Sequence, residues 1–141
     1  MSFVERVVVD TGIWISAALR PASVPAQAVA LALARYEVCV SEATLDELQR
    51  VFARDKFERY LPLADRLAFV DAVRQRATLV PVSSVVTDSP DPNDNPFLAL
   101  ALDAGASLLL ASDPHLCQLH PWRGIPILNP AALVAALTPP R

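Results

Sequence analysis

Short apolar and β-branched runs alternate along this chain with longer segments that favour helices. The first run, over residues 3–9, is almost continuously apolar and stops at Asp10, which is the pattern of a strand buried on both faces. Similar runs occur at 38–40, 78–82, 107–111 and 125–127. Strands that alternate with helices pair in parallel through right-handed crossovers. The sequence therefore predicts an α/β fold with three layers, α/β/α, around a central, mostly parallel sheet of four to five strands.

Helical periodicity and capping residues predict where the helices begin and end. We expect helices over 13–19, 27–35, 42–53, 63–77 and 130–137, and another that starts at Pro96 and ends at Gly105. Ser41 is a suitable N-cap for the helix over 42–53. In the helix over 63–77, the expected core residues are Leu67, Phe69, Val70 and Val73. The polar stretch 83–95 is predicted to be a long loop, and such loops often carry function.

Composition excludes several classes of protein. The 141 residues are 53% hydrophobic with a mean hydropathy of +0.35, which suits one domain over 1–141 and argues against disorder. No stretch reaches the roughly 18 apolar residues of a membrane span, and the first residues lack a secretory pattern, so we expect a cytoplasmic protein.

Cys39 and Cys117 are expected to be reduced thiols. A zinc site at His115, Cys117 and His120 lacks its fourth ligand.

Four acidic residues are expected near one edge of the sheet. Asp10 directly follows the first strand, Asp113 follows the fourth by two residues, and Asp94 lies at the mouth of the next helix. Ligands of open parallel sheets bind beyond the carboxyl ends of the strands. Glu47 lies on the helix after the second strand. At about 100° per residue, its side chain is predicted to point closer to the apolar side of this helix than the side chain of Asp46 does. Each acid also has an ordinary explanation as a cap, a turn residue or a solvated group.

Taken together, these acids favour metal chemistry. Converging carboxylates destabilise a fold unless cations neutralise them, and oxygen ligands suit Mg²⁺ or Mn²⁺. The sequence has no glycine-rich phosphate loop, so nucleotide-cofactor sites are excluded. A Ser or Cys nucleophile has little support, because the chain contains only two histidines and no nucleophile-elbow motif.

A group of basic residues stands out against the net charge of −3. Its members lie within ten residues and are candidates for contacts with a nucleic-acid backbone: Arg50, Arg54, Lys56 and Arg59. A solvated helix face, with these bases paired to Asp55 and Glu58, is the alternative interpretation.

Four segments carry a resemblance to a known family. They are VVVDTGIWISA from Val7, VSEATLDEL from Val40, DPNDNPFLALA from Asp91 and LASDPHL from Leu110. In order and spacing they resemble the PIN-domain family of metal-dependent nucleases, in particular the VapC-like toxins of bacterial toxin–antitoxin pairs. Three positions depart from the family pattern: Gly12 stands where Asn is usual, Ala111 where Thr or Ser is frequent, and His115 where an acid is common.

The resemblance implies a PIN-like fold and a set of functional residues. It makes Asp10, Glu47, Asp94 and Asp113 the catalytic residues that hold Mg²⁺ or Mn²⁺. Polar support around them is expected from Thr11, Ser16, Ser41, Asn95 and Ser112. The implied reaction is endonucleolytic hydrolysis of RNA that leaves a 5′-phosphate and a 3′-hydroxyl. The implied partners are the RNA substrate, a cognate antitoxin protein and a second copy of the chain in a homodimer.

Two other functions are compatible with the same fold, since a fold does not determine function. The main alternative is a catalytically silent PIN-like module that binds nucleic acid or serves as a scaffold. The presence of all four acids favours the enzyme over this module. A structure-specific DNA nuclease is disfavoured, because the sequence contains no extra helical clamp or basic arm.

Overall fold

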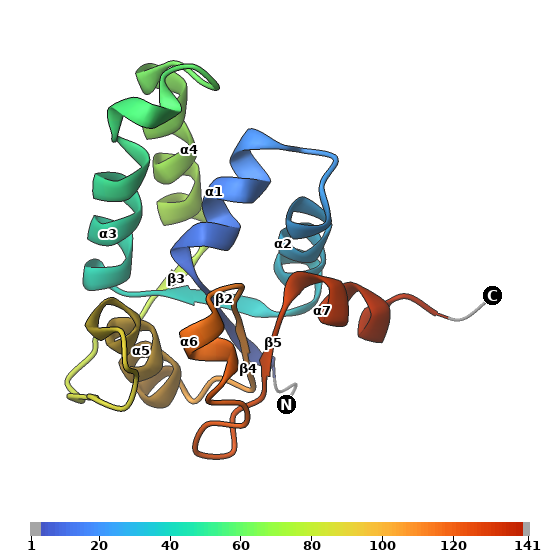
Figure 1. Cartoon of the computed structure of the whole chain (residues 1–141). Helices are drawn as coiled ribbons and strands as arrows, with labels where there is room; N and C mark the ends of the chain where they lie inside the picture. The colour runs from blue at the N-terminus through green and yellow to red at the C-terminus, as the bar shows by residue number, and fades with distance from the viewer. Residues whose placement is uncertain (1–3, 140–141) are drawn as a thin grey trace.

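Five parallel strands form the central sheet in the order β3-β2-β1-β4-β5 (Figure 1). The structure is a computed structural model that describes residues 4–139. The strands are β1 (Arg6–Val9), β2 (Glu37–Val40), β3 (Thr78–Leu79), β4 (Leu108–Leu110) and β5 (Ile127–Leu128). In the middle of the sheet, Val8 of β1 lies between Cys39 of β2 and Leu109 of β4. All four strand pairings are parallel, which confirms the predicted α/β fold.

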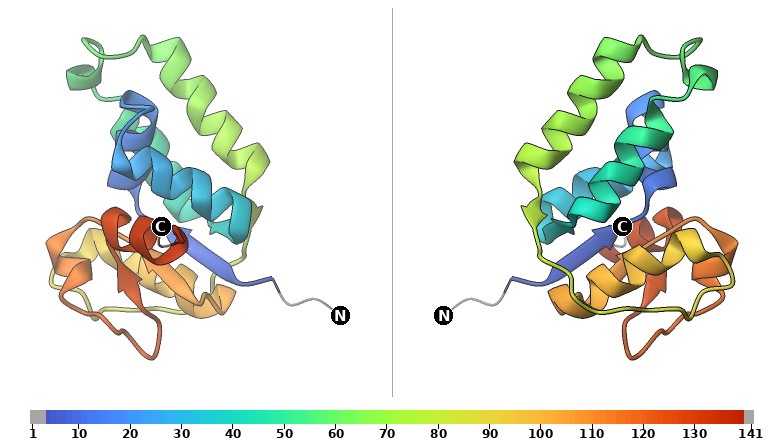
Figure 2. Two further views of the ribbon diagram at one scale, coloured as in Figure 1. Left: turned by 90° about the vertical axis from the view of Figure 1, so that its right-hand side faces the viewer. Right: turned by 90° about the vertical axis from the view of Figure 1, so that its left-hand side faces the viewer.

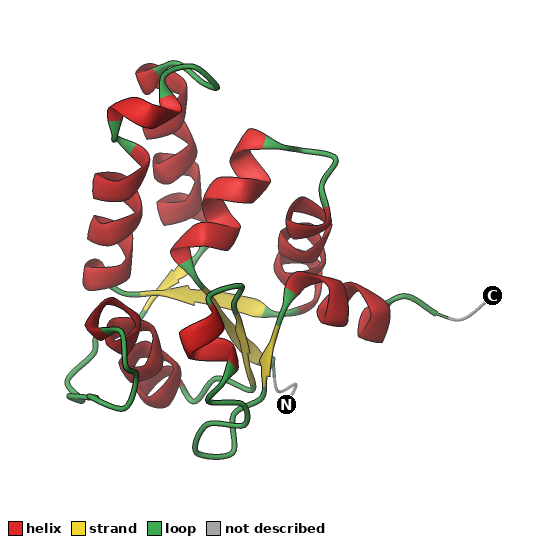
Figure 3. Ribbon diagram, in the orientation of Figure 1, coloured by secondary structure: helices red, strands yellow, loops and turns green. Residues whose placement is uncertain are grey.

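Helices cover both faces of this sheet (Figures 2 and 3). One face is covered by α1 (Thr11–Leu19), α2 (Val24–Arg35), α3 (Glu42–Phe52), α4 (Leu63–Arg76) and α7 (Pro130–Leu137). The other face is covered by α5 (Asn95–Ala104) and the short α6 (Pro114–Cys117). Two 3₁₀ turns, Asp55–Phe57 and Pro92–Asp94, precede α4 and α5. The molecule therefore has the three predicted layers.

The strands supply side chains to two separate cores. Val7 and Val9 of β1 pack against the α1–α4 side, whereas Val8 of the same strand packs with Leu109 and Ile127 on the α5 side. Successive residues of a strand point to opposite faces, so a strand buried on both sides must be apolar throughout. This is why the strands appear in the sequence as continuous apolar runs rather than as alternating patterns.

Several predicted element boundaries differ from the structure. Helix α2 begins at Val24 rather than residue 27, because the Ser23 side chain caps the N–H of Ala26 and Pro25 fits the first turn. Strand β3 has two residues rather than five, since Pro81 lacks the N–H that would continue pairing after Val80. Strand β5 lies at Ile127–Leu128 rather than 125–127, and α6 was not predicted.

Helix α4 differs from the prediction at one core position. Val70 and Val73 are buried as predicted, and Phe69 is partly buried against the same core. Leu67, the fourth expected core residue, is 40% exposed, whereas its neighbour Arg66 is 1% exposed. The guanidinium of Arg66 is satisfied inside by hydrogen bonds to the backbone carbonyls of residues 52, 54 and 61.

None of the helices among residues 4–139 has by itself both the length and the hydropathy to span a bilayer. Only α1 and α2 taken together reach these values, and a bend of 111° separates them.

The two-core arrangement predicts the effect of truncating a central strand. Leu109→Ala should lower the free energy of unfolding by about 2–5 kcal/mol, because Leu109 is fully buried in β4 and its removal leaves a cavity. Val85→Ala is the control, with an expected change below about 0.5 kcal/mol, since Val85 is 89% exposed. Urea unfolding followed by circular dichroism measures both. Equal losses in the two variants would contradict this assignment of the core.

Candidate metal centre

The candidate site lies where the direction of the sheet topology reverses. From β1 the chain proceeds to β2 and β3 on one side, and then crosses through α5 to β4 on the other side of β1. The segments that leave the carboxyl ends of β1 and β4 therefore run to opposite faces of the sheet, into α1 and α6, and leave a crevice between them, the usual ligand position in such sheets. Asp10 follows β1 directly, and Asp113 follows the end of β4 by three residues.

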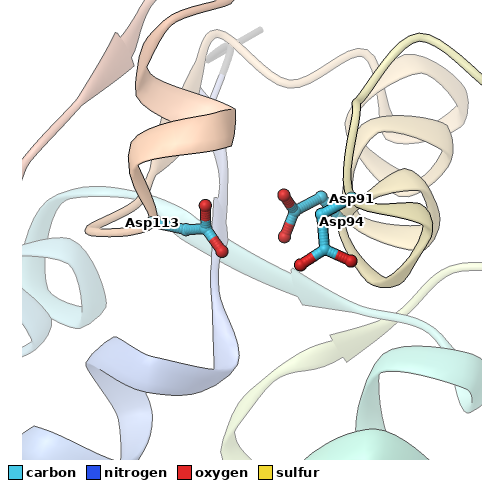
Figure 4. Close-up of side chains that lie close together, drawn as sticks. All are labelled: Asp91, Asp94 and Asp113. Carbon is cyan, nitrogen blue, oxygen red and sulfur yellow. The ribbon is translucent and has the colours of Figure 1, made fainter.

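Three carboxylates at this edge lie close enough to share one cation. Asp91, Asp94 and Asp113 each offer an oxygen, and the three oxygens all lie within 4.8 Å of one another (Figure 4). Asp91 and Asp94 come from the 3₁₀ turn before α5, and Asp113 is the N-cap of α6. Oxygen donors in this number and arrangement fit a hard divalent cation such as Mg²⁺ or Mn²⁺.

Asp10 lies beside this group and is held by the backbone. One of its carboxylate oxygens accepts the N–H of Ile13 at 2.9 Å, and the other accepts the N–H of Ser112 at 2.9 Å. The carboxyl is only 5% exposed. Burial raises the pKa of Asp10, and the backbone N–H groups of Ile13, Ser112 and Asp113 partly oppose this shift. Asp10 is therefore both the N-cap of α1 and a link between β1 and the turn after β4.

Glu47 reaches the same cleft from α3. Its carboxylate accepts a hydrogen bond from the hydroxyl of Thr11, the residue after Asp10. Glu47 is half-buried and Asp46 is exposed, as the helical angle predicts. The cleft has a volume of about 250 Å³, and five acids line it: Asp10, Glu47, Asp91, Asp94 and Asp113. All four predicted catalytic residues thus line one cleft, together with an unpredicted fifth carboxylate.

Ser89 organises the acids of the long loop. Its hydroxyl donates to a carboxylate oxygen of Asp94 at 3.1 Å and accepts the N–H of Asp91 at 3.2 Å. Its own N–H donates to the side-chain carbonyl of Asn95 at 2.9 Å. Ser89 is 6% exposed, although the sequence placed it only within a polar loop. Neither Ser89 nor Asp91 was predicted as a site residue, because the path of a loop has no periodic signal in sequence.

The charge of Asp94 is unfavourable in this environment. Burial raises the pKa of Asp94 to about 6, and the negative charges of Asp113, Asp91 and Asp10 add to the shift, whereas the Ser89 hydrogen bond opposes it. Like charges disfavour ionisation of a neighbouring acid. A cation in the cleft would remove this penalty, which is the chemistry expected of a metal site.

The predicted supporting residues divide into two groups. Thr11 contacts Glu47, Ser112 binds Asp10 through its backbone N–H, and Asn95 binds Ser89. Ser16 and Ser41 do not line the cleft. Ser41 instead forms a capping box with Thr44 at the start of α3, and Ser16 lies on the second turn of α1.

The basic residues also divide. Arg50 and Arg54 line the acidic cleft, and neither forms an ion pair within residues 4–139. Lys56 and Arg59 do not line it. Their charged groups lie over the rings of Phe57 and Tyr60, each 5.1 Å from the ring centroid.

The histidines and cysteines form no comparable site. His120 accepts the N–H of Ile127 at 2.8 Å, and the Cys117 thiol lies 3.6 Å from the carbonyl oxygen of Ala111. Both cysteines are free, as expected. Within the described part of the chain, the only group of three metal-ligand side chains is the acidic one.

Comparisons with known proteins are consistent with this geometry. The model of the PIN domain matches residues 6–115. A search of the curated proteins finds no match. Among solved structures, PAE2754 from Pyrobaculum aerophilum is 14% identical, with a TM-score of 0.65 over 94% of this chain and 89% of that one. VapBC2 from Rickettsia felis, bound to a DNA fragment from its promoter, is 13% identical to this chain. Its TM-score is 0.64 over 88% of this chain and 98% of that one.

A third similar structure comes from Mycobacterium tuberculosis. VapC20, described as a toxin that cleaves the sarcin–ricin loop, is 15% identical, with a TM-score of 0.51 over 76% of this chain and 89% of that one. At these identities the likeness to solved structures is one of fold.

The raised pKa of Asp94 predicts how metal-free stability depends on pH. An acid whose pKa rises on folding from 3.8 to about 6 destabilises the fold at pH 7, and this loss shrinks as the pH falls below 6 and disappears well below 3.8, where the group is protonated in both states. Asp94→Asn should therefore raise the melting temperature in EDTA at pH 7 by roughly 3 °C or more, and the difference from wild type should become much smaller as the pH falls toward 3.8.

The control substitution, Asp103→Asn, should change the melting temperature in the opposite direction. Hydrogen bonds from Ser84 and Ser83 lower the pKa of Asp103, so its stabilising contribution is present at pH 7 and is lost as the pH falls below 3.8. Asp103→Asn should lower the melting temperature at pH 7. Thermal unfolding with EDTA measures both variants. A lower melting temperature for Asp94→Asn at pH 7 would contradict the repulsion between Asp94 and the neighbouring carboxylates.

Proposed function

The chain belongs to the PIN domain family, and on that premise we propose that it is a metal-dependent endoribonuclease, the toxin of a toxin–antitoxin pair. The observation that carries this proposal is the convergence of five carboxylates in one cleft at the carboxyl edge of β1 and β4. A module that only binds RNA has no use for such a cluster, which repels phosphate and destabilises the fold. The proposal takes residues 1–141 as one PIN-like domain of the cytoplasm, as the sequence predicts.

The acidic residues would hold the cation. Asp91, Asp94 and Asp113 form the closest group of oxygens, and Asp10 and Glu47 complete the lining of the cleft. When bound, Mg²⁺ or Mn²⁺ lowers the pKa of a water molecule and stabilises negative charge on phosphate oxygens.

The surrounding residues keep these carboxylates in place. Thr11 orients Glu47, Ser89 orients Asp94, and the backbone N–H groups of Ile13 and Ser112 fix both oxygens of Asp10. A site held by such hydrogen bonds needs little reorganisation when substrate arrives.

The basic residues support a nucleic-acid substrate. Arg50 and Arg54 line the acidic cleft without ion pairs, so their guanidinium groups are available to a phosphate next to the scissile bond. Lys56 and Arg59 follow them along the chain outside the cleft, and we propose that they contact the RNA backbone farther from the scissile bond. RNA as the class of nucleic acid is supported by the fold shared with VapC20, a toxin described as cleaving the sarcin–ricin loop.

The proposed partners rest on the same likeness. The Rickettsia felis structure is a VapBC assembly and covers 88% of this chain at a TM-score of 0.64. We therefore propose a cognate antitoxin that binds this protein, and a homodimer as the state in which the toxin acts.

Cleavage of RNA tests the proposed activity. Purified protein, freed of any bound partner, is incubated with a labelled mixed RNA pool and Mn²⁺, Mg²⁺ or EDTA. Cleavage should require metal and should fall by about 100-fold or more in Asp10→Asn and Asp94→Asn, because each removes a cation ligand. Asp71→Asn, the same substitution at an exposed position of α4 outside the cleft, should retain activity. A folded protein that cleaves nothing with either metal would favour the silent binding module instead.

The contribution of the arginines is tested by the salt dependence of RNA binding. Arg54→Ala should weaken binding and reduce the slope of log affinity against log salt by about one, since one phosphate contact is lost. Arg35→Ala, a control on the exposed end of α2, should leave the slope unchanged. Fluorescence anisotropy with Mg²⁺ and a short RNA that has uncleavable phosphodiester links measures both. An unchanged slope for Arg54→Ala would support the solvated-face interpretation.

A further inference from the structure

Arg66 is a buried cation that the proposed chemistry does not use. It lies on α4 with 1% of its surface exposed, and it is the only basic side chain among residues 4–139 that is buried. A buried charge strongly destabilises a protein unless hydrogen bonds satisfy it, and an apolar residue often serves packing better. The position of Arg66 therefore requires an explanation from its partners.

The partners of Arg66 are the last residue of α3 and three residues of the segment that joins α3 to α4, at the top of Figure 1. Its Nε donates to the carbonyl of Leu61 at 2.8 Å. One terminal nitrogen donates to the carbonyls of Phe52 at 2.7 Å and Arg54 at 3.1 Å, and the other pairs with the carboxylate of Glu58. Carbonyls at a helix C-terminus lack partners within the helix, so the guanidinium caps α3 from a neighbouring helix.

This interaction determines the path of the segment that carries Arg54. Residues 53–61 contain a single 3₁₀ turn and several exposed side chains. Local backbone hydrogen bonds and the packing of Phe57 and Leu61 on the core hold this segment, and the Arg66 contacts are its only side-chain hydrogen bonds to α4 among the described residues. Arg66 binds the backbone carbonyl of Arg54 itself. Arg54 and Arg50, one helical turn earlier, are the two cations that line the acidic cleft.

We propose that Arg66 is a positioning residue for substrate binding: it fixes the segment after α3 so that Arg54 presents its guanidinium to an RNA phosphate beside the acidic cleft. This inference rests on the proposed function. The planar guanidinium group of Arg66 has five N–H donors and can bind three carbonyls and a carboxylate at once. The ammonium group of a lysine has only three N–H donors and cannot do so. Fixing Arg54 before binding lowers the entropy lost when the phosphate contact forms.

A double-mutant cycle distinguishes positioning from a merely structural role. Cleavage kinetics are measured for wild type, Arg66→Met, Arg54→Ala and the double variant. Arg66→Met should raise KM by about tenfold and leave kcat within about threefold, because ordering one long side chain contributes up to that factor in affinity. In the Arg54→Ala background, Arg66→Met should raise KM no further, because the residue through which it acts is gone.

Two further variants sharpen the cycle. Arg66→Lys should still show more than half of the increase in log KM that Arg66→Met shows, since a single ammonium cannot replace the guanidinium fork. Arg76→Met is the matched control, because Arg76 lies on the same helix and donates only to the carbonyl of Leu33. It should leave KM unchanged. Stabilisation by Mn²⁺ in thermal unfolding should be equal in all variants, as the carboxylates remain in place.

The outcomes separate the two proposals. Equal increases in KM in the wild-type and Arg54→Ala backgrounds would overturn the role of Arg66 and leave the nuclease intact. Absence of metal-dependent cleavage by the wild type would overturn the proposed function and this inference with it. If Arg66→Met does not fold, the cycle is run with Glu58→Ala, which removes one partner of the guanidinium at a carboxylate that is 64% exposed. This variant should then raise KM in the wild-type background and leave KM unchanged in the Arg54→Ala background.

Discussion

Mutual repulsion of carboxylates at the carboxyl edge of β1 and β4 is the constraint on which the rest of this structure depends. Asp91, Asp94 and Asp113 bring three oxygens within 4.8 Å of one another, with the buried Asp10 beside them. Such a group is stable in a metal-free protein only when rigid donors hold each member. Backbone N–H groups serve Asp10 and Asp113, and the hydroxyl of Ser89 serves Asp94.

The rigidity of the site comes from the sheet and from the ties on the long loop. Asp10 donates its own N–H to the carbonyl of Leu110 and accepts the N–H of Ser112, so the ends of β1 and β4 are joined at this residue. The loop that carries Ser89 and Asp91 is anchored twice before it reaches the site. Asp103 of α5 accepts the N–H groups of residues 83 and 84, and Asp88 accepts the indole N–H of Trp122 at 2.7 Å.

The positive side of the cleft is built in a different way. Arg50 belongs to a regular helix, whereas Arg54 lies beyond its end, where regular hydrogen bonding has stopped. There the guanidinium of Arg66 provides the order that a helix would otherwise give. Acids held by backbone amides and hydroxyls thus line the cleft together with Arg50, held by its helix, and Arg54, whose carbonyl binds Arg66. The two sides of the cleft can be perturbed independently, which makes metal binding and substrate binding separable by substitution.

The sequence by itself determined the parts of this protein that follow from local pattern. Buried parallel strands must be apolar on both faces, so the runs around Val8 and Leu109 reveal the sheet, and residues that follow a strand directly, such as Asp10, must lie at its carboxyl edge. The angle of Glu47 on its helix was also accessible, because side chains in a helix repeat at a known interval.

Only the tertiary structure decided the rest. The entry of Asp91 into the acidic group and the central position of Ser89 depend on the path of a loop, which distant contacts with Asp103 and Trp122 determine. The inward rotation of Arg66 depends on carbonyls that another helix leaves unpaired. Hydrogen bonds between residues far apart in sequence have no periodic signature, and for this reason they become visible only once the chain is folded.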